Sequence, residues 1–158
     1  MRRLSLVVLK PSLVAGLVAA AVVGGDEWSK AWARQSLGGP HQVLGPWWWR
    51  LRYNSGASFS LGSHAPVATR VGVALALVGV VVGLAKTAPG IPALGIGLVT
   101  GGGLGNVIDR LTSSTHVVTD FVSLGSFPTF NVADAGVTLG CVMMLVCVVV
   151  RRPLWRTR

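Results

Sequence analysis

The feature that most constrains this chain is a set of long apolar runs separated by short polar clusters. The last run follows Asp134 and contains no charged residue before Arg151. A helix needs about 20 predominantly apolar residues to cross the hydrocarbon core of a bilayer. The runs therefore predict membrane-spanning helices over about residues 11–32, 65–85, 91–110 and 132–150.

Composition supports an integral membrane protein. Hydrophobic residues make up 51% of the 158 residues and charged residues only 12%, whereas a soluble domain carries about 25% charged residues. This length fits one domain. We therefore expect a single α-helical membrane domain over residues 1–158, built as a four-transmembrane-helix bundle.

The net charge of +9 is high enough to suggest nucleic-acid binding. A protein that binds nucleic acid usually presents a continuous basic face, but here Lys and Arg flank the apolar runs. Such flanking charge is typical of membrane proteins. No nucleic-acid partner is predicted.

The first run has two interpretations. MRR followed by an apolar stretch and Ala19-Ala20-Ala21 resembles a secretory signal peptide. Lys10 and Pro11 interrupt that stretch, however, and further apolar runs follow. We therefore expect a retained first helix.

The basic residues indicate the orientation of the chain. With four spans, both termini and the loop that carries Lys86 lie on one side, which holds eight of the 14 basic residues, while all five acids lie toward the other side. Basic residues favour the cytoplasmic side. We therefore expect both termini in the cytoplasm and the acids near the extracytoplasmic face.

The segment between the first two runs is rich in aromatic residues. Arg alternates with apolar residues in Trp49-Arg50-Leu51-Arg52-Tyr53, a pattern that favours short strands. The triplet at 47–49 is suited to the interfacial aromatic belt of a membrane. We expect β-strands within about residues 42–62.

Polar residues gather in five short clusters beside the runs. Polar groups inside a membrane protein are costly and are functional candidates by default. Asp134 lies 17 residues before Arg151, or roughly 25 Å along a helix at 1.5 Å per residue, which puts it near the outer edge of the membrane. The clusters are DEWSK at 26–30, NSGASFS at 54–60, GGGLGNVIDR at 101–110, VTDF at 118–121 and FNVAD at 130–134.

Spacing within the clusters predicts shared helix faces. The pairs Asp26 and Lys30, Asn106 and Arg110, and Asn131 and Asp134 are three or four residues apart. The glycines at 101, 102, 103 and 105 allow a neighbouring helix to approach closely.

The chemistry available is that of two carboxylates, Asp120 and Asp134. Paired carboxylates share one proton, so that one acts as a base toward water and the other as an acid. Cys141 and Cys147 lie inside an apolar run, and the histidines show no metal spacing, so no metal or cofactor is expected. A capping or solvated role for Asp120 stays open.

Structural roles are open for two other acids. Asp109 precedes Arg110 and fits a structural ion pair, and Asp26 with Lys30 fits a pair at a helix end. The segment SLGSFPTF at 123–130 is expected to be a loop that returns Asp120 to the level of Asp134, and Phe127-Pro128 predicts a stiff turn.

From Asp26 to about Gly140 the clusters resemble the lipoprotein signal peptidase family, also called signal peptidase II. GGGLGNVIDR, VTDF and FNVAD occur in the family's order in a small chain. The resemblance implies a four-helix membrane bundle with a small extracytoplasmic β-cradle and a short helical element.

The resemblance also implies an activity and a site. An aspartic endopeptidase would remove signal peptides from diacylglyceryl-modified prolipoproteins, cutting before the lipidated cysteine, in the bacterial cytoplasmic membrane. Its partners would be that substrate, membrane lipids and the inhibitor globomycin. The catalytic pair would be Asp120 and Asp134; substrate-binding or supporting residues would be Asp26, Lys30, Asn54, Gly56, Asn106, Arg110 and Asn131.

Four positions depart from the family's usual pattern: Ser29, Ser58, Thr119 and Ala135. All leave the carboxylates and amides in place, and Ser58 and Ala135 are candidates for tuning substrate preference.

Two other functions compete with the peptidase. A small proton- or ion-coupled transporter would also use intramembrane acids, and a structural subunit would need neither aspartate.

Overall fold

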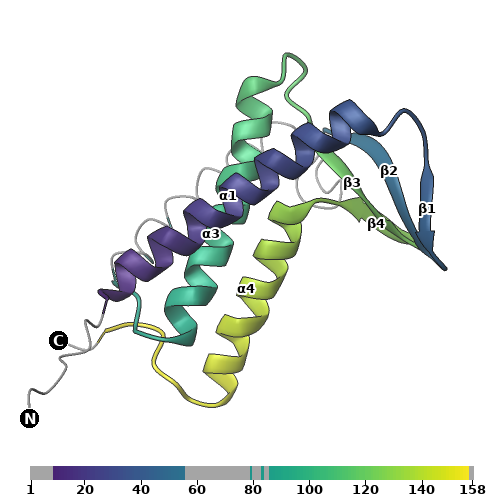
Figure 1. Ribbon diagram of the computed structural model, residues 1–158. Helices are drawn as coiled ribbons and strands as arrows, with labels where there is room; N and C mark the ends of the chain where they lie inside the picture. Colours follow the sequence, from purple (N-terminus) through teal and green to yellow (C-terminus); the bar gives the residue numbers. More distant parts are fainter. Residues whose placement is uncertain (1–8, 56–78, 80–82, 84–85, 157–158) are drawn as a thin grey trace, which may run out of the picture.

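The computed structural model describes residues 9–55, 79, 83 and 86–156 (Figure 1). Three long helices form a bundle, and four strands form a sheet at one end of it. The predicted span at 65–85 lies almost entirely outside the described residues, so the count of four helices remains a prediction. The elements are α1 (Pro11–Ser36), β1 (His41–Leu44), β2 (Trp47–Asn54), α3 (Ile91–Thr112), β3 (Val118–Leu124), β4 (Phe127–Phe130) and α4 (Val132–Val149).

Helix α3 packs against both α1 and α4 through its glycines. A Cβ atom built on Gly101 would lie 2.6 Å from the carbonyl oxygen of Ala19 in α1. On the other side, a Cβ on Gly102 would overlap the carbonyl oxygen of Ala133 in α4. Because only glycine leaves room for these backbones, the predicted close approach of neighbouring helices is confirmed at these two positions.

The outer surface of the bundle is apolar. Along α4, Leu139, Leu145 and Val149 are 54%, 62% and 72% exposed. Soluble proteins rarely expose such long apolar surfaces. Of the described helices, α3 and α4 are long and apolar enough to cross a membrane, which agrees with lipid around the bundle.

The sheet is antiparallel with the order β1-β2-β3-β4. An apolar cluster under it joins Ala33 and Leu37 of α1 to Phe121 and Val122 of β3. The ring of Trp32 meets that of Phe121 edge-on at 6.2 Å. This packing fixes the sheet to the end of α1, so that β3 lies close to the helices (Figure 1).

Residues 123–130 differ from the predicted loop. They belong to the β3–β4 hairpin, whose turn includes Gly125 with φ of +56°. Pro128 lies within β4 and does not make the turn. Since β4 is an edge strand, a residue without a backbone N–H is tolerated there.

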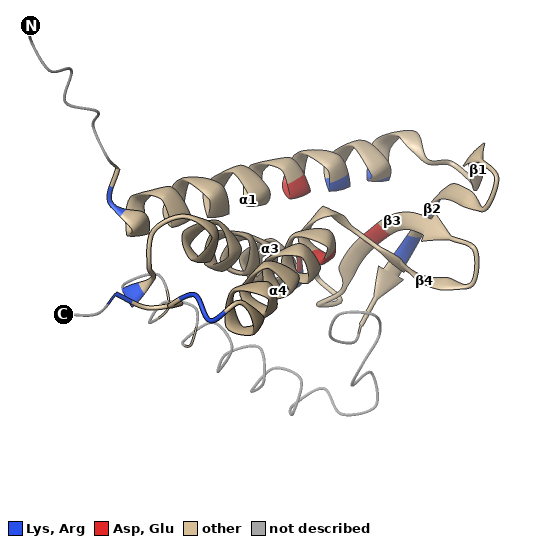
Figure 2. Cartoon of the chain, turned by 90° about the horizontal axis from the view of Figure 1, so that it is seen from below, with Lys and Arg blue, Asp and Glu red and all other residues tan. Residues whose placement is uncertain are grey.

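The end of the bundle opposite the sheet brings together distant parts of the chain. Helix α1 begins there and α4 ends there (Figure 1). Ala88 N–H donates to the carbonyl of Leu154 at 2.9 Å, next to a bridge between Thr87 and Trp155. Lys and Arg residues gather at this end (Figure 2).

Candidate functional site

The polar clusters of five elements meet where the helices join the sheet. Asp26 and Lys30 come from α1, Asn54 from β2, Asn106 and Arg110 from α3, Asp120 from β3, and Asn131 and Asp134 from the start of α4. Of the predicted site residues, only Gly56 lies outside the described part of the chain.

Asp120 is buried on β3 with both carboxyl oxygens hydrogen-bonded. Asn131 Nδ2 donates to Asp120 Oδ1 at 2.7 Å, and Asn54 Nδ2 donates to Asp120 Oδ2 at 3.1 Å. Its side chain is held by β2 and by the residue that caps α4. A solvated loop role for Asp120 is therefore wrong.

Asp134 is buried in the first turn of α4. It forms a capping box with Asn131: Asp134 N–H donates to Asn131 Oδ1 at 2.8 Å, and Asn131 N–H approaches Asp134 Oδ2 at 3.4 Å. Such reciprocal bonds satisfy free N–H groups at a helix start. Asn106 Nδ2 also donates to Asp134 Oδ1 at 2.9 Å, so Asp134 is fixed by two elements.

The side chain of Asn131 joins the two carboxylates. Its amide nitrogen donates to Asp120 and lies 3.1 Å from Asn106 Oδ1, while Asn106 donates to Asp134. One continuous hydrogen-bond network therefore runs from Asp120 to Asp134.

Asp26 and Lys30 form the predicted i, i+4 ion pair. Their charged atoms are 2.6 Å apart and both side chains are fully buried. The pair also reaches beyond α1. Asp26 Oδ1 accepts from Ala133 N–H of α4 at 2.8 Å, and Lys30 Nζ donates to Asn106 Oδ1 at 3.1 Å. It therefore ties α1 to the two elements that hold Asp134.

Asp109 has a wider role than the predicted pair with Arg110. It forms ion pairs with Lys30 at 3.1 Å and Arg34 at 3.2 Å, both on α1. It also accepts from the backbone N–H of Thr119 at 2.7 Å. Because Thr119 immediately precedes Asp120, Asp109 anchors the strand that carries this carboxylate.

Sequence reasoning did not include Arg34 in the site, and it named Thr119 only as a member of the VTDF cluster and as a departure from the family pattern. Arg34 Nη1 donates to Thr119 Oγ1 at 2.9 Å, and the carbonyl of Thr119 accepts from Asn131 at 3.3 Å. Helical spacing could have revealed Arg34 and Asp109 as site residues. Arg34 follows Lys30 by four residues and Asp109 follows Asn106 by three, so each shares a helix face with a predicted site residue.

Arg110 completes the cationic side of the site. Its Nη1 donates to the carbonyl of Asn106 at 3.0 Å. The guanidinium group lies within electrostatic range of Asp134 and Asp120. The positive charge of Arg110 can therefore act on a substrate group that is bound between the two carboxylates.

Burial raises the pKa of Asp120 from 3.8 to about 7, and the negative charge of Asp134 acts in the same direction. The hydrogen bonds from Asn54 and Asn131 and the charge of Lys30 oppose the rise. Burial has the larger effect on the pKa, because the ionised carboxylate loses more stabilisation by water than the hydrogen bonds of the two amides replace. Asp120 is therefore still partly protonated near neutral pH.

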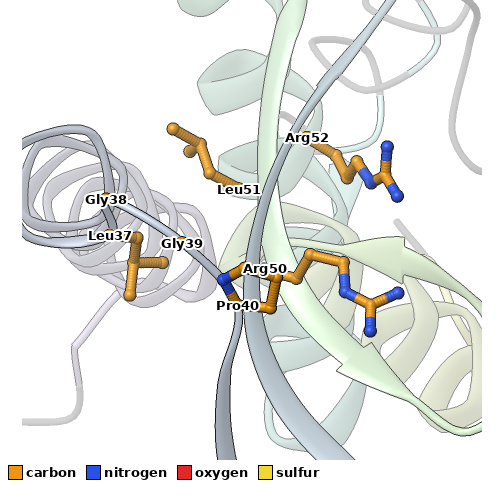
Figure 3. A pocket seen from close by; sticks show the side chains of 7 residues that line it. All are labelled: Leu37, Gly38, Gly39, Pro40, Arg50, Leu51 and Arg52. Atoms are coloured by element: carbon orange, nitrogen blue, oxygen red, sulfur yellow. The ribbon is translucent and has the colours of Figure 1, made fainter.

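Other reactive groups lie elsewhere. Among the described residues, no cluster of three His, Cys, Asp or Glu side chains is arranged to hold a metal ion. Cys141 is exposed and Cys147 is buried, both along α4. A pocket of about 380 Å³ lies between the end of α1 and β2 and is lined by residues 37–40 and 50–52 (Figure 3). The two carboxylates are not part of its lining.

The site can therefore perform acid–base chemistry with two buried carboxyl groups, of which Asp120 is partly protonated near neutral pH. No side chain is needed as nucleophile because a water molecule can take that role.

Comparisons with known proteins identify a matching family model and similar sequences. The family model described as signal peptidase (SPase) II matches residues 18–150. A lipoprotein signal peptidase from Xanthomonas axonopodis pv. citri (strain 306) is 42% identical over 142 residues, covering 80% of each chain. One from Xanthomonas oryzae pv. oryzae (strain PXO99A) is 40% identical over 141 residues, covering 80% of this chain and 82% of the relative.

Two solved structures, each described as a bacterial membrane enzyme, share the fold. One has a TM-score of 0.77 at 24% identity and covers 91% of this chain and 94% of its own. The other has a TM-score of 0.73 at 26% identity and covers 85% of this chain and 91% of its own.

Proposed function

This chain belongs to the signal peptidase II family, a bacterial membrane family that removes signal peptides from prolipoproteins, and on that premise we propose that it is an aspartic endopeptidase with Asp120 and Asp134 as its catalytic pair. The transporter interpretation is not favoured, because the relatives that match most of the chain are peptidases.

One observation carries the proposal. Two buried carboxyl groups, from β3 and from the first turn of α4, are joined through the amide side chains of Asn131 and Asn106. The raised pKa of Asp120, about 7, keeps a large share of this carboxyl group protonated at neutral pH. A pair that holds one proton can give and accept protons in a single turnover.

The carboxylate of Asp134 takes a proton from a water molecule, whose oxygen attacks the carbonyl carbon of the scissile peptide. Asp120 donates its proton to the carbonyl oxygen as the tetrahedral intermediate forms. The proton on Asp134 then passes to the peptide nitrogen, the C–N bond breaks, and Asp120 recovers a proton from the intermediate. The products are a carboxyl group and the free amine of the new N-terminus.

The supporting residues fix this geometry. Asn54 and Asn131 orient Asp120, while Asn106 orients Asp134. Asp26 and Lys30 hold α1 against the start of α4. Arg110 faces the pair with a positive charge and stabilises the negative charge that develops on the scissile carbonyl oxygen. Gly56 is assigned with them by resemblance alone.

The remaining assignments follow from the family and from the site's place in the bundle. The substrate is a diacylglyceryl-modified prolipoprotein cut before its lipidated cysteine, whose acyl chains stay in the lipid beside α4. The enzyme spans the cytoplasmic membrane with both termini inside and the sheet outside. Globomycin is expected to inhibit it by occupying the site.

The proposal is tested with Asp120→Asn and Asp134→Asn, which keep the shape of each side chain but remove its acid–base chemistry. Each is expected to lower kcat by ~100-fold or more, measured by the product mass from a lipidated prolipoprotein in a bilayer. Glu27→Gln makes the same chemical change outside the hydrogen-bond network and should stay close to wild type. Normal processing by either aspartate variant would disprove the aspartic mechanism.

A further inference from the structure

Two arginines of β2 line the pocket beside the catalytic strand. Arg50 and Arg52 contribute to it together with Leu51 and residues 37–40, which lead from α1 into β1. In Figure 3 the side chains of Arg50 and Arg52 extend to the same side of β2, whereas Leu37 and Leu51 lie on the other side. Leu37 and Leu51 therefore give the pocket an apolar wall on one side of β2, and the two guanidinium groups lie on the other side.

The register of the sheet places this edge next to Asp120. Arg52 is paired directly with Asp120 across β2 and β3, and paired residues of antiparallel strands project from the same face. Asn54, two residues along β2, lies on that face too and donates to Asp120. Arg52 is thus the direct cross-strand neighbour of Asp120 on the face of the sheet that carries this carboxyl group.

Neither guanidinium group has an acidic partner in the part of the chain that the structure describes. Arg52 is exposed. Arg50 lies over the ring of Trp48 at 5.7 Å, but its Nε is buried and has no hydrogen-bond partner among the described residues. A buried donor without a partner is uncommon and calls for an explanation.

We propose that Arg50 and Arg52 form a subsite for an acidic side chain of the prolipoprotein, close to the scissile bond. The inference rests on the proposed function, because it takes Asp120 as the place where the peptide is cut. A guanidinium group offers parallel N–H donors that match a carboxylate.

The position favours the substrate over a lipid headgroup. A peptide whose scissile bond reaches Asp120 must pass the neighbouring position on the same face of the sheet, which is Arg52. An extended peptide advances about 3.3 Å per residue. The acidic residue should therefore lie within about four residues of the cleavage site.

The test compares matched substrates on the active enzyme. Lipidated prolipoprotein peptides carry Glu or Gln, in turn, at each position within about four residues of the cut, and kcat and KM are measured in zwitterionic bilayers. At one position we expect the Glu peptide to have a kcat/KM roughly tenfold higher, the size of a charged hydrogen bond, mainly through a lower KM.

Enzyme variants assign that preference to the arginines. Arg52→Gln and Arg50→Gln should raise the KM of the Glu peptide about tenfold and leave the Gln peptide nearly unchanged. Arg151→Gln, at the opposite end of the bundle, should keep the wild-type preference. If the β2 variants do not fold, the comparison of peptides on the wild-type enzyme still decides.

Equal kcat/KM for Glu and Gln peptides at every position would overturn the subsite. So would a preference that survives both β2 substitutions, or a rate that follows the fraction of anionic lipid in the bilayer instead of the peptide sequence. Each of these results would leave the catalytic pair intact, because its own test is the loss of turnover in Asp120→Asn and Asp134→Asn.

Discussion

At the residue scale, opposing effects act on Asp120. Two amide donors stabilise its ionised form, while burial and the charge of Asp134 stabilise the protonated form. The second group of effects is larger, so the pKa of Asp120 lies at about 7. The acid of the proposed pair is therefore assigned to the sheet and the base to α4.

This assignment predicts the pH dependence of turnover. Because Asp120 must be protonated, kcat/KM should fall as pH rises through about 7, approaching a tenfold loss per pH unit above it. A profile of kcat/KM against pH on a lipidated substrate measures this, with melting curves showing that the enzyme stays folded. A rate that keeps rising above pH 8 would contradict the assignment.

The same pKa affects stability. The pKa of Asp120 in the folded state lies above its ordinary value of 3.8, so ionisation of this group favours the unfolded chain. Its contribution to the free energy of unfolding is therefore greatest below about pH 4, declines as pH rises, and levels off above about pH 7.

Single residues were predictable where their partners are close in sequence. Asp26 and Lys30 lie four residues apart on one helix, and their ion pair followed from spacing. Asp109 was assigned to its neighbour Arg110, but it pairs with Arg34, 75 positions away. Adjacent residues of a helix do not face each other, and a pair between helices cannot be found without knowing how those helices pack.

At the scale of elements, the contact between α3 and α4 depends on Gly102. A methyl group there would overlap the carbonyl oxygen of Ala133, which lies one residue before Asp134. We expect Gly102→Ala to destabilise the protein by about 1–3 kcal/mol, the usual cost of overpacking. Thermal unfolding in detergent measures the loss.

Gly16→Ala is the matched control for that variant. Gly16 also lies in a helix, but a Cβ there would meet nothing within 4 Å among the described residues. Alanine favours a helix over glycine by up to about 1 kcal/mol, so this variant should be neutral or stabilising. A similar loss for both substitutions would show that close packing at Gly102 does not matter.

The sequence predicted strand β2 but not strand β3. Residues 47–54 alternate and contain aromatic side chains, and they form β2 within the segment predicted to hold strands. In β3 six consecutive residues are buried, because the strand lies between β2 and β4 and also contacts α1 and α3. A strand buried on both faces shows no alternation, and the sequence therefore concealed the hairpin after Asp120.

At the scale of the whole molecule, the two ends of the bundle differ in chemistry. One end carries the sheet and the carboxyl groups; the other carries the start of α1, the end of α4 and the pairing of residues 86–88 with 154–156 (Figure 1). Apolar runs and their flanking charges predicted this division. They did not predict how the sheet and helices would bring the amides and carboxyl groups together.

This division predicts the accessibility of the two ends. In a variant without Cys141 and Cys147, a cysteine at Lys10 or Arg156 should react with a membrane-impermeant thiol reagent only after the cells are opened. A cysteine at Ser126, in the β3–β4 turn, should react in intact spheroplasts. The reverse pattern would contradict the proposed orientation.

The side chains that hold the proposed catalytic pair are the amides of Asn54, Asn106 and Asn131. An amide neither gains nor loses a proton at physiological pH. A proton can therefore move from one carboxyl group to the other without altering the charge of the groups that hold them. In the proposed mechanism, the charge of this amide framework is therefore the same before and after each turnover.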